Sequence, residues 1–168
     1  AHADLRDELD GEKWSHACAA RRSLDKGAGQ LIQIGVRAWS REEATFSEND
    51  NRVLTHLASD ILAVSNGQKF WDSLMNELSM ISGPVWISVD IDVLDGYLVP
   101  STGTPVPGGL SWWHLESALA TIFESKNCRV LGADVVETVP DIEGSLTPFT
   151  AAMIATRLVG GHIHRSIQ

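Results

Sequence analysis

The sequence has few cysteines and no long hydrophobic run. Cys18 and Cys128 are the only two cysteines among 168 residues, which is too few for a disulfide framework, and they lack the C-x-x-C spacing of redox and zinc motifs. No apolar run approaches the roughly 20 residues of a transmembrane helix, and no segment has the pattern of a signal peptide. These absences predict a protein of the reducing cytoplasm that is not inserted in a membrane.

Positive charge is also scarce. The chain has 13 Lys and Arg against 22 Asp and Glu, a formal net charge of −9. An acidic surface repels nucleic-acid phosphates and anionic lipid headgroups, so neither partner is expected, whereas a small cationic substrate is compatible. With 43% hydrophobic residues, residues 1–168 are long enough for one core, and we expect a single domain.

Three of the acids follow an apolar segment directly. Residues 85–96 read Val-Trp-Ile-Ser-Val-Asp-Ile-Asp-Val-Leu-Asp-Gly, and the β-branched run predicts a strand whose period of two puts Asp90 and Asp92 on one face. Two hard carboxylates aimed at one point favour a divalent cation, Mn²⁺ or Mg²⁺ ahead of Zn²⁺. A metal-free Asx-type turn remains an alternative. A calcium loop fits less well, because it needs a different acid spacing and a preceding helix.

Histidines and another acid lie near the start of the chain, in Ala1-His2-Ala3-Asp4 and Ser15-His16-Ala17-Cys18. Each cluster alone is a weak signal, since an isolated His is more often structural than a ligand. Together with Asp90 and Asp92, His2 and Asp4 could supply a mixed nitrogen and oxygen shell for two metal ions. A two-metal site activates one water for attack, so the residues favour a hydrolase.

Strand and helix signals alternate along the chain. The predicted elements are a strand at 31–36, a helix with a capping box of Ser40 and Glu43, an ambiguous stretch at 51–64, an amphipathic helix at 69–82, a strand from Val85, a turn-rich loop at 100–109, a helix capped by Ser111, a strand at 130–136, and a helix from Thr147-Pro148 to Gly160-Gly161. The alternation predicts an α/β fold, a three-layer sandwich with a mainly parallel sheet and helices on both faces. Ligands of such sheets collect at the carboxyl ends of the strands, where Asp90 and Glu137 stand.

Four motifs of the chain resemble those of the ureohydrolases (arginases, agmatinases and relatives), and most closely the agmatinases. Residues 1–4 look like the end of the family's D-A-H-x-D motif and residues 88–95 like its S-x-D-x-D-x-x-D motif, while 102–109 and 134–137 match its two later motifs in order and spacing. The resemblance covers nearly the whole chain. Gly96 departs from the usual Pro, and the leading Asp and an upstream G-G-D-H motif are absent. We therefore expect the C-terminal portion of a catalytic domain with an arginase-like fold, incomplete at the N-terminus.

The resemblance also implies roles for individual residues. It implies two Mn²⁺ per complete subunit, with four ligands: His2, Asp4, Asp90 and Asp92. Asp90 would bridge both ions and Asp4 would orient the attacking hydroxide. His16 would shuttle a proton, Glu137 would bind the substrate guanidinium, and Thr104 would line that pocket. The family further implies a homo-oligomer, a trimer or hexamer.

Such a site would hydrolyse a guanidino group to urea and an amine, and the leaving amine needs a proton that His16 can deliver. Residues 5–15 contain four acids against two bases, which favours a terminal ammonium over a carboxylate. The prediction is hydrolysis of agmatine to putrescine and urea. These charges could equally be solvated without touching the substrate.

Other functions remain open at this point. The chain could be an arginase or a guanidinobutyrase-type ureohydrolase, or a catalytically inactive fragment or subunit of this fold. A zinc deacetylase of related architecture is a further alternative, and the pairing of Asp90 with Asp92, together with Glu137, argues against it.

Overall fold

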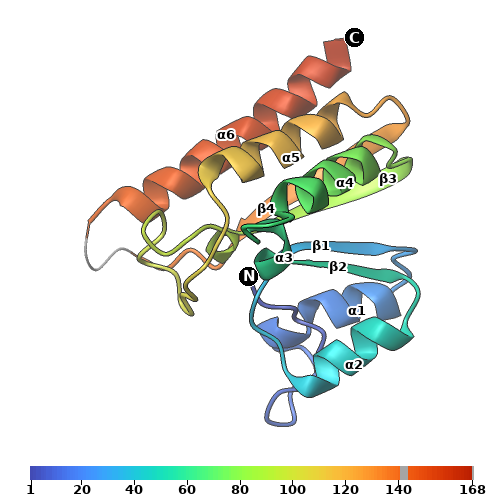
Figure 1. Cartoon of the computed structure of the whole chain (residues 1–168), viewed down its shortest axis with the longest axis vertical. Helices are drawn as coiled ribbons and strands as arrows, with labels where there is room; N and C mark the ends of the chain where they lie inside the picture. Colours follow the sequence, from blue (N-terminus) through green and yellow to red (C-terminus); the bar gives the residue numbers. More distant parts are fainter. Residues whose placement is uncertain (141–143, 168) are drawn as a thin grey trace.

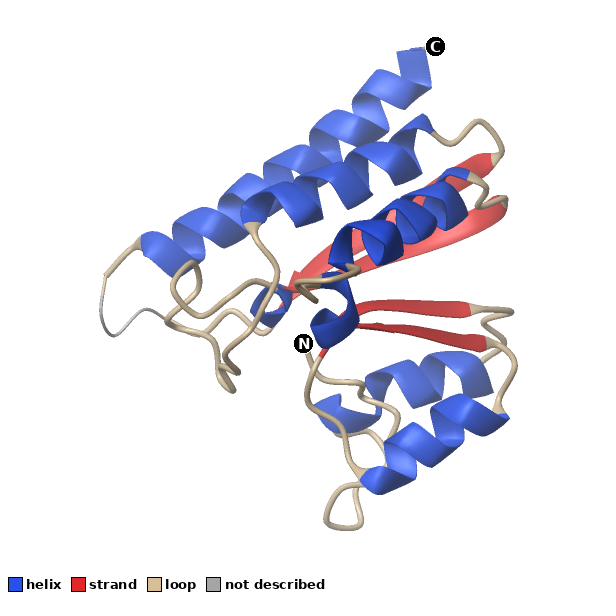
Figure 2. Ribbon diagram, viewed as in Figure 1, coloured by secondary structure: helices blue, strands red, loops and turns tan. Residues whose placement is uncertain are grey.

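The strands of the computed structural model are parallel and form two pairs. The structure describes residues 1–140 and 144–167. Strand β1 (Leu31–Val36) pairs with β2 (Val53–Leu57), and β3 (Gly83–Asp90) pairs with β4 (Cys128–Val136). Figure 2 shows the two pairs. The predicted parallel arrangement is confirmed, although within the described residues β1 and β3 share no ladder and the four strands do not form one continuous sheet.

Helices lie on both sides of the strands, as the α/β prediction requires. Helices α1 (Ala19–Asp25) and α2 (Arg41–Asn49) lie beside β1 and β2, whereas α4 (Gly67–Ser79), α5 (Trp112–Glu124) and α6 (Leu146–Ile167) lie on the opposite side, beside β3 and β4 (Figure 1). The remaining helices are short: η1 (His16–Cys18), α3 (Ala58–Ile61) and η2 (Ile91–Val93).

The apolar residues form two clusters. The larger one joins β3 and β4 to α4, α5 and α6, and it includes Leu74, Ile91 and Ile154, all fully buried. The smaller one consists of five buried residues with their neighbours: Ala3, Leu5, Leu24, Val36 and Val53. Burying one large aliphatic side chain stabilises a fold by roughly 1.5–3 kcal/mol. The smaller cluster therefore anchors the first residues of the chain against β1 and β2.

Most local signals in the sequence are confirmed. Strand β1 has the predicted bounds, and the capping box of Ser40 and Glu43 opens α2. Ser111 caps α5 as expected, with His114 as the reciprocal partner. The ambiguous stretch at 51–64 contains β2 and α3.

The predicted bounds of the last helix are wrong at both ends. Helix α6 begins at Leu146 and runs through Gly160 and Gly161 to Ile167. Gly161 lies inside the helix at a close contact with α5, where a Cβ would lie 2.4 Å from the Phe123 ring. At the other end, Thr147 is helical, and its hydroxyl accepts a hydrogen bond from the Ser101 N–H at 2.9 Å rather than capping.

Cys18 and Cys128 are buried free thiols, as expected from their number and spacing. In the described parts of the chain, no helix combines the length and apolarity needed to cross a bilayer.

Candidate active site

The acids after β3 lie on a turn rather than along a strand. Strand β3 ends at Asp90, and the next three residues form the 3₁₀ helix η2. The Asp92 N–H donates to Asp90 Oδ1 at 3.1 Å, so Asp90 caps η2 in an Asx-type turn. The prediction that Asp90 and Asp92 share one face of a strand is wrong, because the strand ends between them. The turn nevertheless keeps the two carboxylates together.

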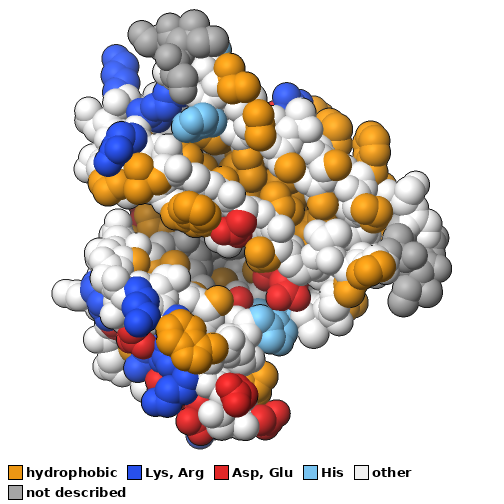
Figure 3. All heavy atoms as spheres, turned by 180° about the vertical axis from the view of Figure 1, so that it is seen from behind, with side chains coloured by type: hydrophobic (Ala, Val, Ile, Leu, Met, Phe, Trp, Pro, Cys, Tyr) orange, Lys and Arg blue, Asp and Glu red, His pale blue; other side chains and the backbone are white. Residues whose placement is uncertain are grey.

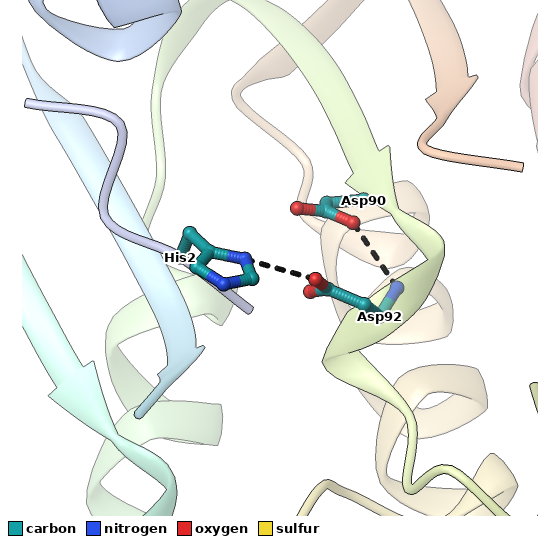
Figure 4. Close-up of side chains that lie close together, drawn as sticks. All are labelled: His2, Asp90 and Asp92. Atoms are coloured by element: carbon teal, nitrogen blue, oxygen red, sulfur yellow. Dashed lines mark hydrogen bonds and ion pairs between the residues drawn. The ribbon is translucent and has the colours of Figure 1, made fainter. Parts of the chain in front are cut away.

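His2 joins these two acids from the N-terminal segment. Three potential ligand atoms, one each from His2, Asp90 and Asp92, lie within 4.8 Å of one another. Figure 4 shows the His2 ring facing the Asp92 carboxylate, with Nδ1 2.9 Å from Oδ2. His2 is held there by a parallel bridge to Ala38, just after β1. The structure therefore brings together three of the four predicted metal ligands.

The first five residues alternate between buried and half-buried positions. Ala1, Ala3 and Leu5 are buried, whereas His2 and Asp4 are half-buried. This alternation follows from the packing of the apolar residues, Ala1 in the larger cluster and Ala3 and Leu5 in the smaller one. It directs His2 and Asp4 away from the apolar side. Asp4 has a positive φ of 53°, which Asp tolerates better than most residues.

Asp92 has the environment of a cation ligand. Its side chain is 1% exposed, and neither carboxylate oxygen accepts a hydrogen bond among the described residues. The His2 imidazole, 2.9 Å from Oδ2, and the Ala1 nitrogen, 3.2 Å from Oδ1, lie within ion-pair distance. A buried carboxylate needs such cationic neighbours or a bound cation. Carboxylate oxygens with one imidazole suit Mn²⁺ or Mg²⁺, so this donor set fits the implied metal.

Two carboxyl groups of the site bind protons unusually tightly. Burial, reinforced by the negative charge of Asp92, raises the pKa of Asp90 to about 7. Burial also raises the pKa of Asp4 to about 6, although His2 and His16 oppose the shift. Without a cation Asp90 is partly protonated at neutral pH and Asp4 below about pH 6, and a bound cation would displace these protons.

A second pair of predicted residues meets at the ends of η1 and β4. The Nδ1 atom of His16 lies 3.1 Å from Oε1 of Glu137, and the His16 side chain is 66% exposed. Glu137 directly follows β4 with a positive φ of 63°. Its carbonyl oxygen accepts a hydrogen bond from the Thr102 hydroxyl at 2.9 Å. An exposed imidazole beside a carboxylate can exchange protons with solvent and with a bound substrate.

Two threonines of the 102–109 motif have different environments. Thr104, the predicted pocket residue, is exposed and makes no contact with His16 or Glu137 among the interactions of the described residues. Thr102 is buried and fixes the Glu137 backbone. Sequence reasoning missed Thr102, because a hydroxyl that holds a backbone group has no motif of its own.

The acids of residues 5–15 are partly neutralised. Asp7 lies 2.7 Å from Arg22 and 3.6 Å from Lys13. The three other acids of this segment are exposed: Glu8, Asp10 and Glu12. In the space-filling view, acidic and histidine side chains lie next to one another on the rear face (Figure 3). The negative potential available to a substrate therefore comes from fewer acids than the sequence count suggests.

Comparisons with known proteins identify the family of the chain. The model of the arginase family matches residues 1–160. An agmatinase of Pyrococcus horikoshii is 38% identical over 160 residues, covering 95% of this chain and 52% of that protein. An N(1)-aminopropylagmatine ureohydrolase of Thermococcus kodakarensis is 33% identical over 160 residues, covering 95% and 51%. The chain thus spans about half the length of the curated relatives it matches.

Solved structures show the same fold. The agmatine ureohydrolase of Thermoplasma volcanium superposes with a TM-score of 0.79 at 31% identity, over 96% of this chain and 52% of that one. The proclavaminate amidino hydrolase of Streptomyces clavuligerus superposes with a TM-score of 0.75 at 26% identity, over 96% and 53%. The predicted arginase-like fold is confirmed.

Proposed function

The chain belongs to the arginase family, and from this premise we propose that its residues form most of the active site of a metal-dependent ureohydrolase. The observation that carries the proposal is the convergence of ligand atoms from His2, Asp90 and Asp92 within 4.8 Å at the carboxyl end of β3. This is the edge at which parallel sheets bind ligands.

The metal of the proposal is a pair of Mn²⁺ ions. The residues that would hold them are His2, Asp4, Asp90 and Asp92. When bound, such ions lower the pKa of water enough to supply hydroxide at neutral pH. Attack on a guanidinium carbon needs hydroxide because that carbon is a weak electrophile.

Glu137 and His16 would act on the substrate itself. A guanidinium is planar and pairs with a carboxylate through two parallel hydrogen bonds. The Glu137 carboxylate now contacts His16, so a substrate guanidinium would compete with the imidazole for it. His16 would then donate a proton to the departing amine nitrogen, which makes the amine a good leaving group. Asp4, half-buried two residues after His2, would orient the attacking hydroxide.

The substrate of the proposal carries an ammonium at its far end. Glu8, Asp10 and Glu12 are exposed next to the segment that carries His16, and their charge attracts an ammonium and repels a carboxylate. Agmatine, which would yield urea and putrescine, is the first candidate. Aminopropylagmatine, the substrate named for the Thermococcus kodakarensis relative, has the same cationic end and is the second.

The test is urea release from four substrates: agmatine, aminopropylagmatine, arginine and guanidinobutyrate. It should be made with Mn²⁺, with Zn²⁺ and with a chelator, on the longest product of the coding sequence that contains this chain. We expect the two amine-ended substrates to react fastest with Mn²⁺. Faster turnover of arginine, or activity with Zn²⁺ alone, would contradict the proposal.

A charge variant of the 5–15 segment tests the substrate preference separately. Replacing Glu8 and Glu12 by Gln and Asp10 by Asn removes three negative charges at nearly constant shape, and Asn also tolerates the positive φ of 52° at residue 10. The KM for agmatine should rise and the KM for arginine should fall. Unchanged values would mean that the segment is solvated and does not affect the substrate.

A further inference from the structure

Arg37 connects two segments that carry different parts of the proposed site. Its Nη2 donates to the Asp92 carbonyl at 2.7 Å and to the Val106 carbonyl at 2.6 Å, and its Nε donates to the same Val106 carbonyl at 2.9 Å. Weaker bonds reach the carbonyls of Leu94, Gly35 and Val93 at 3.3–3.5 Å. One guanidinium therefore binds both the turn at 90–95 and the loop at 102–109.

These partners are unusual for an arginine. Among the described residues no ion pair closer than 4.0 Å involves Arg37; its hydrogen-bond acceptors are all backbone carbonyls. The side chain is half-buried, and its charge is balanced at longer range by Asp90, Asp92 and Asp95. A planar fork with five N–H groups can bind several fixed carbonyls at once, whereas a Lys ammonium has a single nitrogen and no fork.

Asp95, a negatively charged residue, binds the same loop through its N–H groups. Its Oδ2 accepts hydrogen bonds from the N–H groups of Gly108 and Gly109 at 2.9 and 2.8 Å. Gly109 must lack a side chain here, because a Cβ would lie 2.4 Å from the Asp95 nitrogen. Residues 94 and 110 also form a parallel bridge. The C-terminal end of the loop is thus fixed by Asp95, which leaves Arg37 as the link to Val106, in the middle of the loop.

We propose that Arg37 is a positioning residue that holds the 102–109 loop at a fixed place relative to the metal-binding turn at 90–95. This role rests on the proposed function, in which the turn would bind metal and the loop would face the substrate guanidinium. Thr102, at the start of the loop, holds the Glu137 backbone. A shift of the loop would act on the Glu137 backbone through Thr102, which is also bridged to Thr138, while η2 and the Asp90 cap would still hold the metal ligands.

The decisive variant is Arg37→Lys, which keeps the positive charge and removes the fork. Amide hydrogen exchange in the loop, measured at the Gly108 and Gly109 N–H groups that bind Asp95, should accelerate by about tenfold or more, as expected when a loop loses its fixed contacts. The affinity for Mn²⁺ alone should change less than about threefold, and the KM for agmatine should rise by about tenfold, because misplacing a binding group weakens substrate positioning. Arg37→Met tests the loss of the charge as well.

Arg165 supplies a matched control. It too binds backbone carbonyls with its guanidinium, those of Phe123 and Ser125 at 3.2 and 2.6 Å, at the end of α5. Arg165→Lys should leave exchange in residues 103–110 and the KM unchanged. Asp95→Ala is the positive control for a released loop.

Two outcomes would overturn the proposal. One is unchanged exchange of the loop in Arg37→Lys, and the other is equal acceleration in Arg165→Lys, which would indicate general destabilisation. Because hydrogen exchange needs no turnover, the proposed function can fail independently: a loosened loop in a protein that releases no urea would refute the hydrolase and retain the role of Arg37 in fixing the loop.

Discussion

The Nδ1 atom of His16 lies 3.1 Å from Oε1 of Glu137, although the two residues are 121 positions apart in the sequence. His16 begins the short helix η1, and Glu137 directly follows β4. Since Glu137 is 27% exposed, its carboxylate can exchange the imidazole for a cationic ligand. We therefore make one prediction for Glu137 and one for His16.

Replacing Glu137 by Gln should weaken the binding of every guanidino substrate by a similar factor. The guanidinium of each substrate would contact the carboxylate charge that this change removes. A charge-assisted hydrogen bond contributes about 1.5–3 kcal/mol, so KM should rise by about tenfold or more. Steady-state kinetics on agmatine and arginine measure this. A change confined to one substrate would show that Glu137 contacts the part in which the two substrates differ.

His16→Ala should lower kcat by roughly a hundredfold, since a positioned acid contributes about that much, and the bound metal should be unaffected. Metal content and rate must be measured on the same sample. Loss of metal in this variant would make His16 a ligand and disprove its role as a proton donor.

The metal ligands can be distinguished by amide variants that keep the shape of the turn. Asp90→Asn retains an oxygen to accept the Asp92 N–H but removes the charge of the residue expected to bridge two ions. It should abolish binding of both Mn²⁺ ions, whereas Asp92→Asn should remove mainly one. Electron paramagnetic resonance titration with Mn²⁺ counts the ions. Equal losses in the two variants would contradict the bridging role of Asp90.

Local features of the fold were predictable because their causes are local. The β-branched run at 31–36 and the serines at 40 and 111 determine elements through their own backbone and nearest neighbours, and β1 and both caps agree with the prediction. Gly161 lies inside α6 and leaves room for Phe123 of another helix. No pattern within residues 146–167 contains that information.

The site was predictable in composition but not in geometry. The motifs identified His2, Asp90 and Asp92, and the structure places their ligand atoms together. The strand that was expected to align the two acids ends at Asp90, because the Asp90 side chain caps a turn. Arg37 gave no signal at all, since an arginine that binds carbonyls has no characteristic spacing in the sequence.

The raised pKa of Asp4 predicts an unusual pH dependence for the metal-free protein. A carboxyl group whose pKa is about 6 in the fold and 3.8 ordinarily binds protons more tightly when folded, so stability falls as pH rises from about 4 to about 6. Asp4→Asn cannot titrate and suits the same positive φ. It should be more stable than the parent by about 1–2 kcal/mol at pH 8, allowing for solvent screening, and equal to it at pH 4.

Urea denaturation with a chelator present, at pH values from 4 to 8, measures this difference. Asp90 shifts in the same direction but is present in both proteins, so it cancels to first order in the comparison. A constant difference between Asp4→Asn and the parent across the whole range would mean that Asp4 does not titrate near pH 6.

Gly96 follows the segment that resembles the S-x-D-x-D-x-x-D motif, where the resemblance leads us to expect Pro, and proline should fit there. The Leu98 N–H donates to the Asp95 carbonyl at 2.9 Å, which puts Gly96 at the second position of a β-turn, a position that favours proline. A Cβ there would meet nothing within 4 Å, and φ is not in the left-handed region. Among the described residues the Gly96 N–H donates no hydrogen bond. Gly96→Pro should therefore raise the free energy of unfolding by about 0.4–1 kcal/mol, by restricting the unfolded chain.

The matched control is Gly108→Pro in the neighbouring loop. Gly108 has a φ of 81°, and its N–H donates to Asp95, so proline there loses a hydrogen bond and cannot adopt the backbone angle. It should destabilise the protein, while Gly96→Pro stabilises it with an unchanged dependence on urea concentration. If Gly96→Pro lowered stability, Asp95 would be held in a conformation that a following proline forbids. In that case the glycine would be needed to keep the Asp95 carboxylate on Gly108 and Gly109.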